Sequence, residues 1–294
     1  DLAHELLDDG GLRRYHHLVA QWLELRPDGN ELEHQEEAAR HLYRAGDHEA
    51  AARRFHRAAD AARDRYINEH AIRLYHRALS CVGERDMATR ILLWHDLGNV
   101  YQLKGDLDSA LDAFERMLRL SWVVASRTKA GVAFNKIGRV WRQKGNLDLA
   151  LEYLERGRGL FRQAADLRGV ATSLDDIAQS FWLLGRYDKA LDRSAKALEM
   201  RRKLGHKRSI AASLSNIGNI EKDRGLFDEA EACFQEAMDL RKEVNDRYGY
   251  VTSLMNLGTL AFERGNLRQS REFREDALTE AEKTTISHYA DTLG

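Results

Sequence analysis

The chain has 294 residues, of which 32% are charged, and its 46 Lys and Arg residues nearly balance its 47 Asp and Glu residues. This balance leaves no electrostatic excess to drive binding to nucleic acid or to a membrane surface, so neither is an expected partner. No stretch approaches the roughly 18 apolar residues of a membrane-spanning helix. The two cysteines, Cys81 and Cys233, lie far apart in helical patterns, which disfavours a disulfide framework and makes a cytoplasmic location the expectation.

Residues 1–85 are predicted to form a helical lead-in of degenerate repeat units. The segment 27–30 reads Pro-Asp-Gly-Asn, a turn signal, and Asn30 with Glu33 can form a capping box for a helix that runs to Ala45. Gly46 then opens the first of two short segments in which small and aromatic residues recur with one helical spacing. They are Ala51, Phe55 and Ala58 in the first segment, and Ala71, Tyr75 and Ala78 in the second.

From residue 86 onwards the chain is periodic. A glycine returns every 40 residues, at Gly105, Gly145, Gly185, Gly225 and Gly265. A fixed period of this length is typical of stacked supersecondary units, each of which buries its apolar face against its neighbours. In the first unit, Trp94, Leu97 and Tyr101 follow helical spacing, and Ala110 and Phe114 continue it beyond the turn. Each unit is therefore predicted to be a pair of amphipathic helices.

The glycines form two columns with different expected roles. Gly105 and its equivalents separate the two apolar stripes, where a residue able to take positive φ can close the first helix, and Asp106 or Asn146 can then cap the second helix. The second column lies inside the first helix, where glycine costs about 1 kcal/mol relative to alanine. It consists of Gly98, Gly138, Ala178, Gly218 and Gly258. We expect close approach of the partner helix here, with the small residues of the Ala110 column opposite.

These columns, an aromatic residue or Leu followed by Leu-Gly, an aromatic residue, Gly, Ala and Phe, resemble the tetratricopeptide repeat. The resemblance covers five units in residues 86–283 and looks most like the long repeats of Pins-type adaptors and kinesin light chains. The units are longer than the usual repeat and lack its terminal proline, since Pro27 is the single proline. The resemblance implies an all-α fold, a right-handed superhelical α-solenoid of antiparallel helix pairs. Residues 284–294 are expected to begin a further helix or to form a tail.

The end of the chain allows two interpretations. Leu293 and Gly294 match the Leu-Gly of a further repeat, which would leave the stack without its natural cap and open to self-association. Alternatively, Ser270, Arg271 and Arg274 replace apolar residues and make the last unit a polar cap.

The lead-in has a resemblance of its own. Residues 13–24, 36–47 and 68–79 read RRYHHLVAQWLE, EEAARHLYRAGD and NEHAIRLYHRAL. These segments resemble the helices that follow the ATPase in large bacterial signal-transduction ATPases of the STAND class, including MalT-like activators. The resemblance implies an alternative function, in which the chain is the ligand-sensing or regulatory arm of such an ATPase or of a transcriptional regulator. It also implies a nucleotide-binding domain in the same parent chain.

Signatures of catalysis and of metal or cofactor binding are absent from the sequence, so we expect a protein that is not an enzyme, with no cofactor, no catalytic residues and no metal site. No P-loop or GxGxxG motif occurs, and Asp8 stands where the HExxH pattern needs its second histidine. Nine of the 12 histidines precede residue 80, but their spacing completes no ligand set. Surface or packing roles are favoured for them, with a metal site or a pH sensor as the minority alternatives.

A second stripe adjoins the apolar stripe on the first helix of each unit, and the resemblance to tetratricopeptide repeats implies that it lines a concave groove. The resemblance also adds Lys136, Asn216 and Asn256 to this groove, whose candidate partner-binding residues are Asn99, Gln102, Asn135, Lys136, Arg139, Arg142, Gln179, Trp182, Asn216, Asn219, Lys222, Asn256 and Phe262. Below we call this set the first-helix stripe.

The composition of the first-helix stripe indicates the kind of partner. Amides can pair with both the N–H and the C=O groups of an extended peptide, while Lys136, Arg139 and Arg142 can hold carboxylates. Trp182 and Phe262 offer apolar anchors. We therefore expect a non-enzymatic interaction scaffold that binds a peptide or helix of a partner protein, with a preference for acidic segments. The alternative is an ordinary hydrated surface, on which Asp175 and Asp176 neutralise the basic residues.

Overall fold

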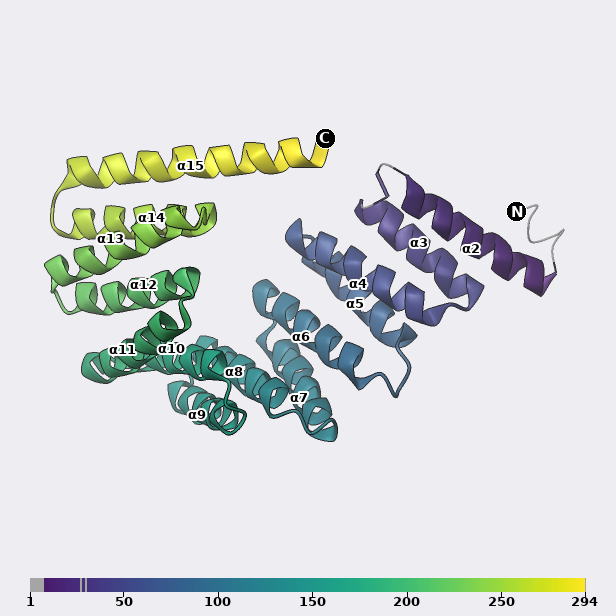
Figure 1. Cartoon of the computed structure of the whole chain (residues 1–294), viewed down its shortest axis with the longest axis horizontal. Coiled ribbons are helices and arrows are strands. Elements are labelled where there is room, and N and C mark those ends of the chain that lie inside the picture. The colour runs from purple at the N-terminus through teal and green to yellow at the C-terminus, as the bar shows by residue number, and fades with distance from the viewer. Residues whose placement is uncertain (1–7, 27, 30, 294) are drawn as a thin grey trace. The chain divides into compact units, whose positions relative to one another are not determined.

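The computed structural model describes residues 8–26, 28, 29 and 31–293, with side chains as far as residue 283. These residues form helices and no strands, as Figure 1 shows, which confirms the all-α prediction. The helices are α2 (Asp9–Leu25), α3 (Leu32–Ala45), α4 (His48–Asp64), α5 (Asn68–Cys81), α6 (Met87–Lys104), α7 (Leu107–Val123), α8 (Arg127–Gln143), α9 (Leu147–Gln163), α10 (Leu167–Leu183), α11 (Tyr187–Leu204), α12 (Lys207–Asp223), α13 (Phe227–Glu243), α14 (Arg247–Glu263) and α15 (Leu267–Leu293).

The chain divides into two compact parts, residues 1–144 and residues 145–294. In the first part, each helix from α2 to α8 packs against the next one along the chain. In the second part, α9 to α15 do the same, and α12 also contacts both α10 and α14. Short turns join the consecutive helices, so each helix runs back along the one before it. Each part is thus a stack of antiparallel helix pairs.

The turns inside the repeats have the predicted chemistry. Gly105 adopts φ 84°, a left-handed conformation that closes α6 and that only glycine takes without strain. Asp106 then caps α7, because its carboxylate accepts the Ser109 N–H at 3.2 Å. Asn146 caps α9 in the same way, accepting the Leu149 N–H at 3.1 Å. These local signals position the two helices of a unit before any tertiary contact is considered.

Aromatic rings explain the second glycine column. A Cβ atom on Gly98 would lie 2.5 Å from Cε1 of Phe114, and one on Gly218 would lie 2.6 Å from Cε1 of Phe234. The expectation that small residues of the Ala110 column lie opposite is therefore wrong at these two glycines. A fully buried phenylalanine of the second helix fills the space instead.

The third unit has a different pair at the same two positions. Ala178 stands in the column of Gly98 and Gly218, and Ser194 stands in the column of the two phenylalanines. Ser194 is buried and its hydroxyl has no hydrogen-bond partner. Thus the larger residue on the first helix coincides with the smaller residue on the second helix, which indicates that the two columns share one packing volume.

The lead-in helices share an apolar core with α6, in which Phe55 and Tyr75 are buried among small residues. α3 starts at Leu32 with Glu31 as its N-cap. The capping box expected from Asn30 lies outside the described residues. At the other end of the chain, the backbone of residues 284–293 continues α15 without a break. No helix in the described part is both long and apolar enough to cross a membrane.

Candidate functional site

In residues 1–144, the structure brings the predicted residues of α6 and α8 into contact. Lys136 Nζ donates a hydrogen bond to Asn99 Oδ1 at 2.6 Å, and Gln102 Nε2 donates to Oε1 of Gln143 at 2.8 Å. Asn135 is only 4% exposed, so it offers little surface to a partner. The first-helix stripe is therefore a connected row of polar groups here.

The basic residues of this row are already engaged. Lys136, Arg139 and Arg142 are half-buried, and each takes part in further interactions. Lys136 also lies over the ring of Phe114, 5.9 Å from its centroid. A carboxylate of a partner would therefore have to exchange with contacts that these cations already make.

In residues 145–294, the predicted apolar and basic residues Trp182, Lys222 and Phe262 lie near the C-terminal ends of α10, α12 and α14. Trp182 Nε1 donates to Asp223 Oδ2 at 2.8 Å. Lys222 Nζ lies between Asp223 and Glu263, at 2.7 Å and 2.9 Å from their carboxylate oxygens. The Phe262 side chain is 58% exposed. Lys222 is thus neutralised by two carboxylates, while Phe262 remains open to a partner.

The predicted amides of residues 145–294, unlike Trp182 and Lys222, are not paired with other side chains in the described part of the chain. Gln179 on α10, Asn216 and Asn219 on α12, and Asn256 on α14 are half-buried. None of their side chains makes a hydrogen bond to another residue in the described part of the chain. Because α12 contacts both α10 and α14, the four amides belong to neighbouring helices. Each has a carbonyl oxygen that can accept and an NH2 group that can donate hydrogen bonds to a partner.

A buried polar cluster beneath this stripe escaped the sequence analysis. Asp175 on α10 forms an ion pair with Arg201 on α11, and both side chains are almost fully buried. Arg201 also donates to Ser213 Oγ at 2.6 Å and to the Ser209 carbonyl at 3.0 Å. Burial raises the pKa of Asp175 to about 6, although the Arg201 charge opposes this shift. The carboxylate of Asp175 is therefore committed to Arg201, on the neighbouring helix.

The next repeat contains the same arginine without its carboxylate. Arg241 corresponds to Arg201, is 7% exposed and donates to Ser253 Oγ at 2.6 Å. The position of Asp175 is taken by Ser215, which is buried and has a hydroxyl without a hydrogen-bond partner. Burial lowers the pKa of Arg241, and no carboxylate in the described part forms an ion pair with it. In the sequence, this cluster is marked only by the recurrence of Arg201 as Arg241 and of Ser213 as Ser253, each 40 residues later.

We expect the substitution Ser215→Asp to lower the free energy of unfolding, relative to Ser215→Asn, by about 1–3 kcal/mol at pH 8 and by much less at pH 5. The equivalent carboxyl of Asp175 has its pKa raised to about 6 even beside Arg201, so burial disfavours the ionised form more than the guanidinium favours it. Urea unfolding followed by circular dichroism measures the change. Ser215→Asn is the matched control, since it has nearly the same shape and no charge. Equal stability of Ser215→Asp and Ser215→Asn at pH 8 would show that position 215 does not place an ionised carboxyl in a buried site beside Arg241.

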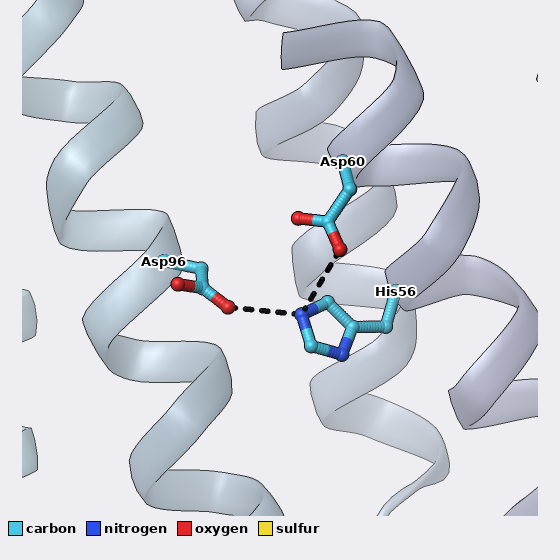
Figure 2. Close-up of side chains that lie close together, drawn as sticks. All are labelled: His56, Asp60 and Asp96. Atoms are coloured by element: carbon cyan, nitrogen blue, oxygen red, sulfur yellow. Dashed lines mark hydrogen bonds and ion pairs between the residues drawn. The ribbon is translucent and has the colours of Figure 1, made fainter. Parts of the chain in front are cut away.

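A second polar cluster, in residues 1–144, joins the lead-in to the first regular unit. His56 Nε2 on α4 lies 2.9 Å from Asp96 Oδ2 on α6 and 3.6 Å from Asp60 Oδ2 on α4. Figure 2 draws these two contacts as dashed lines. Burial alone would lower the pKa of His56, but the hydrogen bond to Asp96 and the two carboxylate charges outweigh it and raise the pKa. The pKa of Asp96 is lowered despite its burial, because two histidines contact it. These three side chains are the group in the described chain that could hold a metal ion.

Comparisons of the sequence identify the repeat. A family model for the tetratricopeptide repeat matches residues 130–203 and 209–283, and a second model for this repeat matches residues 93–121. These matches span the five regular units. No curated protein sequence matches the chain significantly.

Solved structures show the same fold at low sequence identity. BtubC (BKLC) from P. vanneervenii is 19% identical, with a TM-score of 0.59 over 79% of this chain and 92% of that one. A STAND protein with a tetratricopeptide repeat sensor from Pyrococcus horikoshii is 16% identical, with a TM-score of 0.62 over 95% of this chain and 45% of that one. A Rap protein complexed with competence and sporulation factor is 15% identical, with a TM-score of 0.66 over 96% of this chain and 78% of that one.

Three features of the chain agree with one repeat type. The 40-residue units form antiparallel helix pairs, the glycine turns and caps recur as predicted, and the family model matches half of the chain. The chain belongs to the tetratricopeptide repeat family.

Proposed function

We propose that this chain is an interaction scaffold that binds a peptide or helix of a partner protein along the first-helix stripe of α10, α12 and α14. The tetratricopeptide repeat fold implies a protein–protein interaction scaffold. A fold neighbour, the Rap protein, is known in complex with competence and sporulation factor, which supports a binding role for such a helical stack. The single observation that carries the proposal is that the amides of this stripe, Gln179, Asn216, Asn219 and Asn256, make no hydrogen bond to another residue in the described part of the chain.

The chemistry of these amides favours a backbone as their ligand. Each amide has one acceptor and two donor hydrogens, so several of them can pair with C=O and N–H groups of an extended segment. Half-buried polar groups also gain more from a partner that excludes water than fully exposed ones do. Phe262, in the same stripe, offers an exposed ring for an apolar side chain of the partner.

We propose the preference for acidic segments separately, for a segment that binds the first-helix stripe of α6 and α8 within residues 1–144, where Lys136, Arg139 and Arg142 lie. Since these cations already have contacts, an acidic partner would gain only the difference between its own ion pairs and those it replaces. We therefore expect acidic residues to affect the salt dependence and the association rate more than the final affinity.

The test begins with peptides selected from a random display library against the whole chain. For the selected peptides, the double substitution Gln179→Ala and Asn219→Ala is expected to weaken binding at least tenfold, measured by isothermal titration. Gln235→Ala is the control, because Gln235 is an exposed amide on the second helix α13. Unchanged affinity in the double variant, with an unchanged unfolding midpoint, would remove the amides from the proposal.

A second candidate function is the sensor arm of a signalling ATPase. The observation that favours it is the STAND protein with a repeat sensor, whose structure matches 95% of this chain, lead-in helices included, while the chain spans less than half of that protein. The parent gene supplies the test: a nucleotide-binding domain encoded upstream of residue 1 supports this function, and a parent without one excludes it.

A further inference from the structure

The cluster of His56, Asp60 and Asp96 has the layout of a metal-ligand set. Figure 2 shows both carboxylates directed at one imidazole nitrogen, His56 Nε2, from two different helices. One ligand atom from each residue lies within 4.8 Å of the other two. The side chains of His56 and Asp96 are 19% and 13% exposed, so the cluster is shielded on most sides while Asp60, at 36%, leaves an approach from solvent.

Each carboxylate is held in place through its other oxygen. Asp60 Oδ1 accepts hydrogen bonds from the Tyr75 hydroxyl at 2.7 Å and from Arg63 at 2.9 Å, which leaves Oδ2 facing His56. Asp96 Oδ1 lies 2.8 Å from His95 Nδ1, which likewise leaves Oδ2 facing His56. Metal-binding carboxylates are typically oriented by such hydrogen bonds to the oxygen that does not bind the ion.

The spacing also fits an ion of the size of Zn²⁺. With bonds of about 2.0–2.1 Å to nitrogen and oxygen, the ligands of a tetrahedral Zn²⁺ lie roughly 3.3–3.4 Å apart. The distances from His56 Nε2 to the two carboxylate oxygens, 2.9 Å and 3.6 Å, bracket this value. A shift of a few tenths of an ångström would therefore equalise them, and water from the exposed side would complete the coordination.

The charge of the cluster favours a cation. Asp60 and Asp96 carry two negative charges, and Arg63, which pairs with Asp60, also pairs with Asp64. With neutral His56, these three carboxylates and one guanidinium have a net charge of −2, so a divalent ion is attracted. One imidazole with two carboxylates is a donor set that suits Zn²⁺ and similar first-row ions better than Ca²⁺, which prefers six or more oxygens.

We propose that His56, Asp60 and Asp96 bind a divalent transition-metal ion, with Zn²⁺ as the best match, and that this ion links helix α4 of the lead-in to helix α6 of the first regular unit. Tyr75, Arg63 and His95 orient the two carboxylates. The competing arrangement is a proton in place of the ion, with His56 as an imidazolium between the two carboxylates.

Titration of the whole chain with Zn²⁺ tests the site, with Co²⁺ as a spectroscopic probe whose visible absorption reports tetrahedral coordination. We expect the unmodified chain to bind one more ion than the variants His56→Gln and Asp96→Asn. His48→Gln is the matched control, because His48 is an exposed histidine on the same helix, and it should leave this ion in place.

A fourth variant separates loss of the site from loss of the fold. Tyr75→Phe removes one hydroxyl, keeps the ring in the core, and should weaken Zn²⁺ binding about tenfold while the helix content measured by circular dichroism stays unchanged. The proposal is overturned if the unmodified chain takes up no Zn²⁺, or if the variants His56→Gln and Asp96→Asn take up as much Zn²⁺ as the unmodified chain. The cluster then holds a proton, with His56 as an imidazolium between the two carboxylates.

Discussion

Replacing Arg201 by Met is expected to lower the free energy of unfolding by about 3–5 kcal/mol at pH 8, because it leaves the buried carboxylate of Asp175 without a counter-ion. Arg201 and Asp175 have side-chain exposures of only 12% and 10%, so water cannot replace the lost partner. Urea unfolding followed by circular dichroism measures the loss. At pH 5 the loss should be smaller: the pKa of Asp175 is already raised to about 6, and removal of Arg201 raises it further, so the carboxyl is then neutral in the folded state.

Two controls distinguish this mechanism from loss of packing. Arg202→Met removes the exposed ion pair with Glu236 and should cost less than about 1 kcal/mol. The double variant Arg201→Met with Asp175→Leu should recover most of the stability, since an apolar pair of similar volume can replace a buried ion pair. A loss that is equal at both pH values, and that persists in the double variant, would show that the arginine acts through packing alone.

The second large effect concerns Phe234 and Gly218. Phe234→Ser is expected to cost about 3–5 kcal/mol, because it empties the volume of a fully buried ring beside the bare backbone of Gly218. Gly218→Ala in the unmodified chain should also be destabilising, since its Cβ would lie 2.6 Å from the ring and overpacking outweighs the helix-propensity gain of about 1 kcal/mol.

The two substitutions together reproduce the Ala178 and Ser194 pair of the third unit. In the Phe234→Ser background, Gly218→Ala should therefore become stabilising by about 1 kcal/mol, because the clash is gone and the helix propensity remains. The sign change in this double-mutant cycle is the measurement that matters. If Gly218→Ala has the same sign in both backgrounds, the two columns do not share one packing volume.

The helix pairs and their turns were predictable because their causes are local. Helical spacing of Trp94, Leu97 and Tyr101 depends only on residues within two turns of one helix, and Gly105 with Asp106 closes one helix and caps the next through neighbouring backbone groups. The same apolar spacing and glycine turn recur every 40 residues, so the fold class could be assigned from one sequence.

The candidate site was predictable only as a stripe. Helical spacing placed Gln179 and Asn219 beside the core stripe, and the resemblance to tetratricopeptide repeats added Asn216 and Asn256 to the same groove. Which polar groups are already paired depends on neighbours from other helices. Lys222 is neutralised by Asp223 and by Glu263, which lies on α14. At one position of the stripe, Asn135, Asp175 and Ser215 are buried, whereas Met255 is 44% exposed. Whether a polar side chain is available to a partner is therefore a property of the packed helices.

The sequence by itself determined the helical repeat, the places of its turns and caps, and the face of each first helix that adjoins the core. These features follow from backbone conformation and from apolar spacing within one helix or one turn. Tertiary structure alone decided that Phe114 and Phe234 occupy the space above Gly98 and Gly218. It also brought together His56 with Asp96, and Asp175 with Arg201. These contacts join different helices, and their distances are set by how side-chain volumes fill the space between the helices rather than by spacing along the chain.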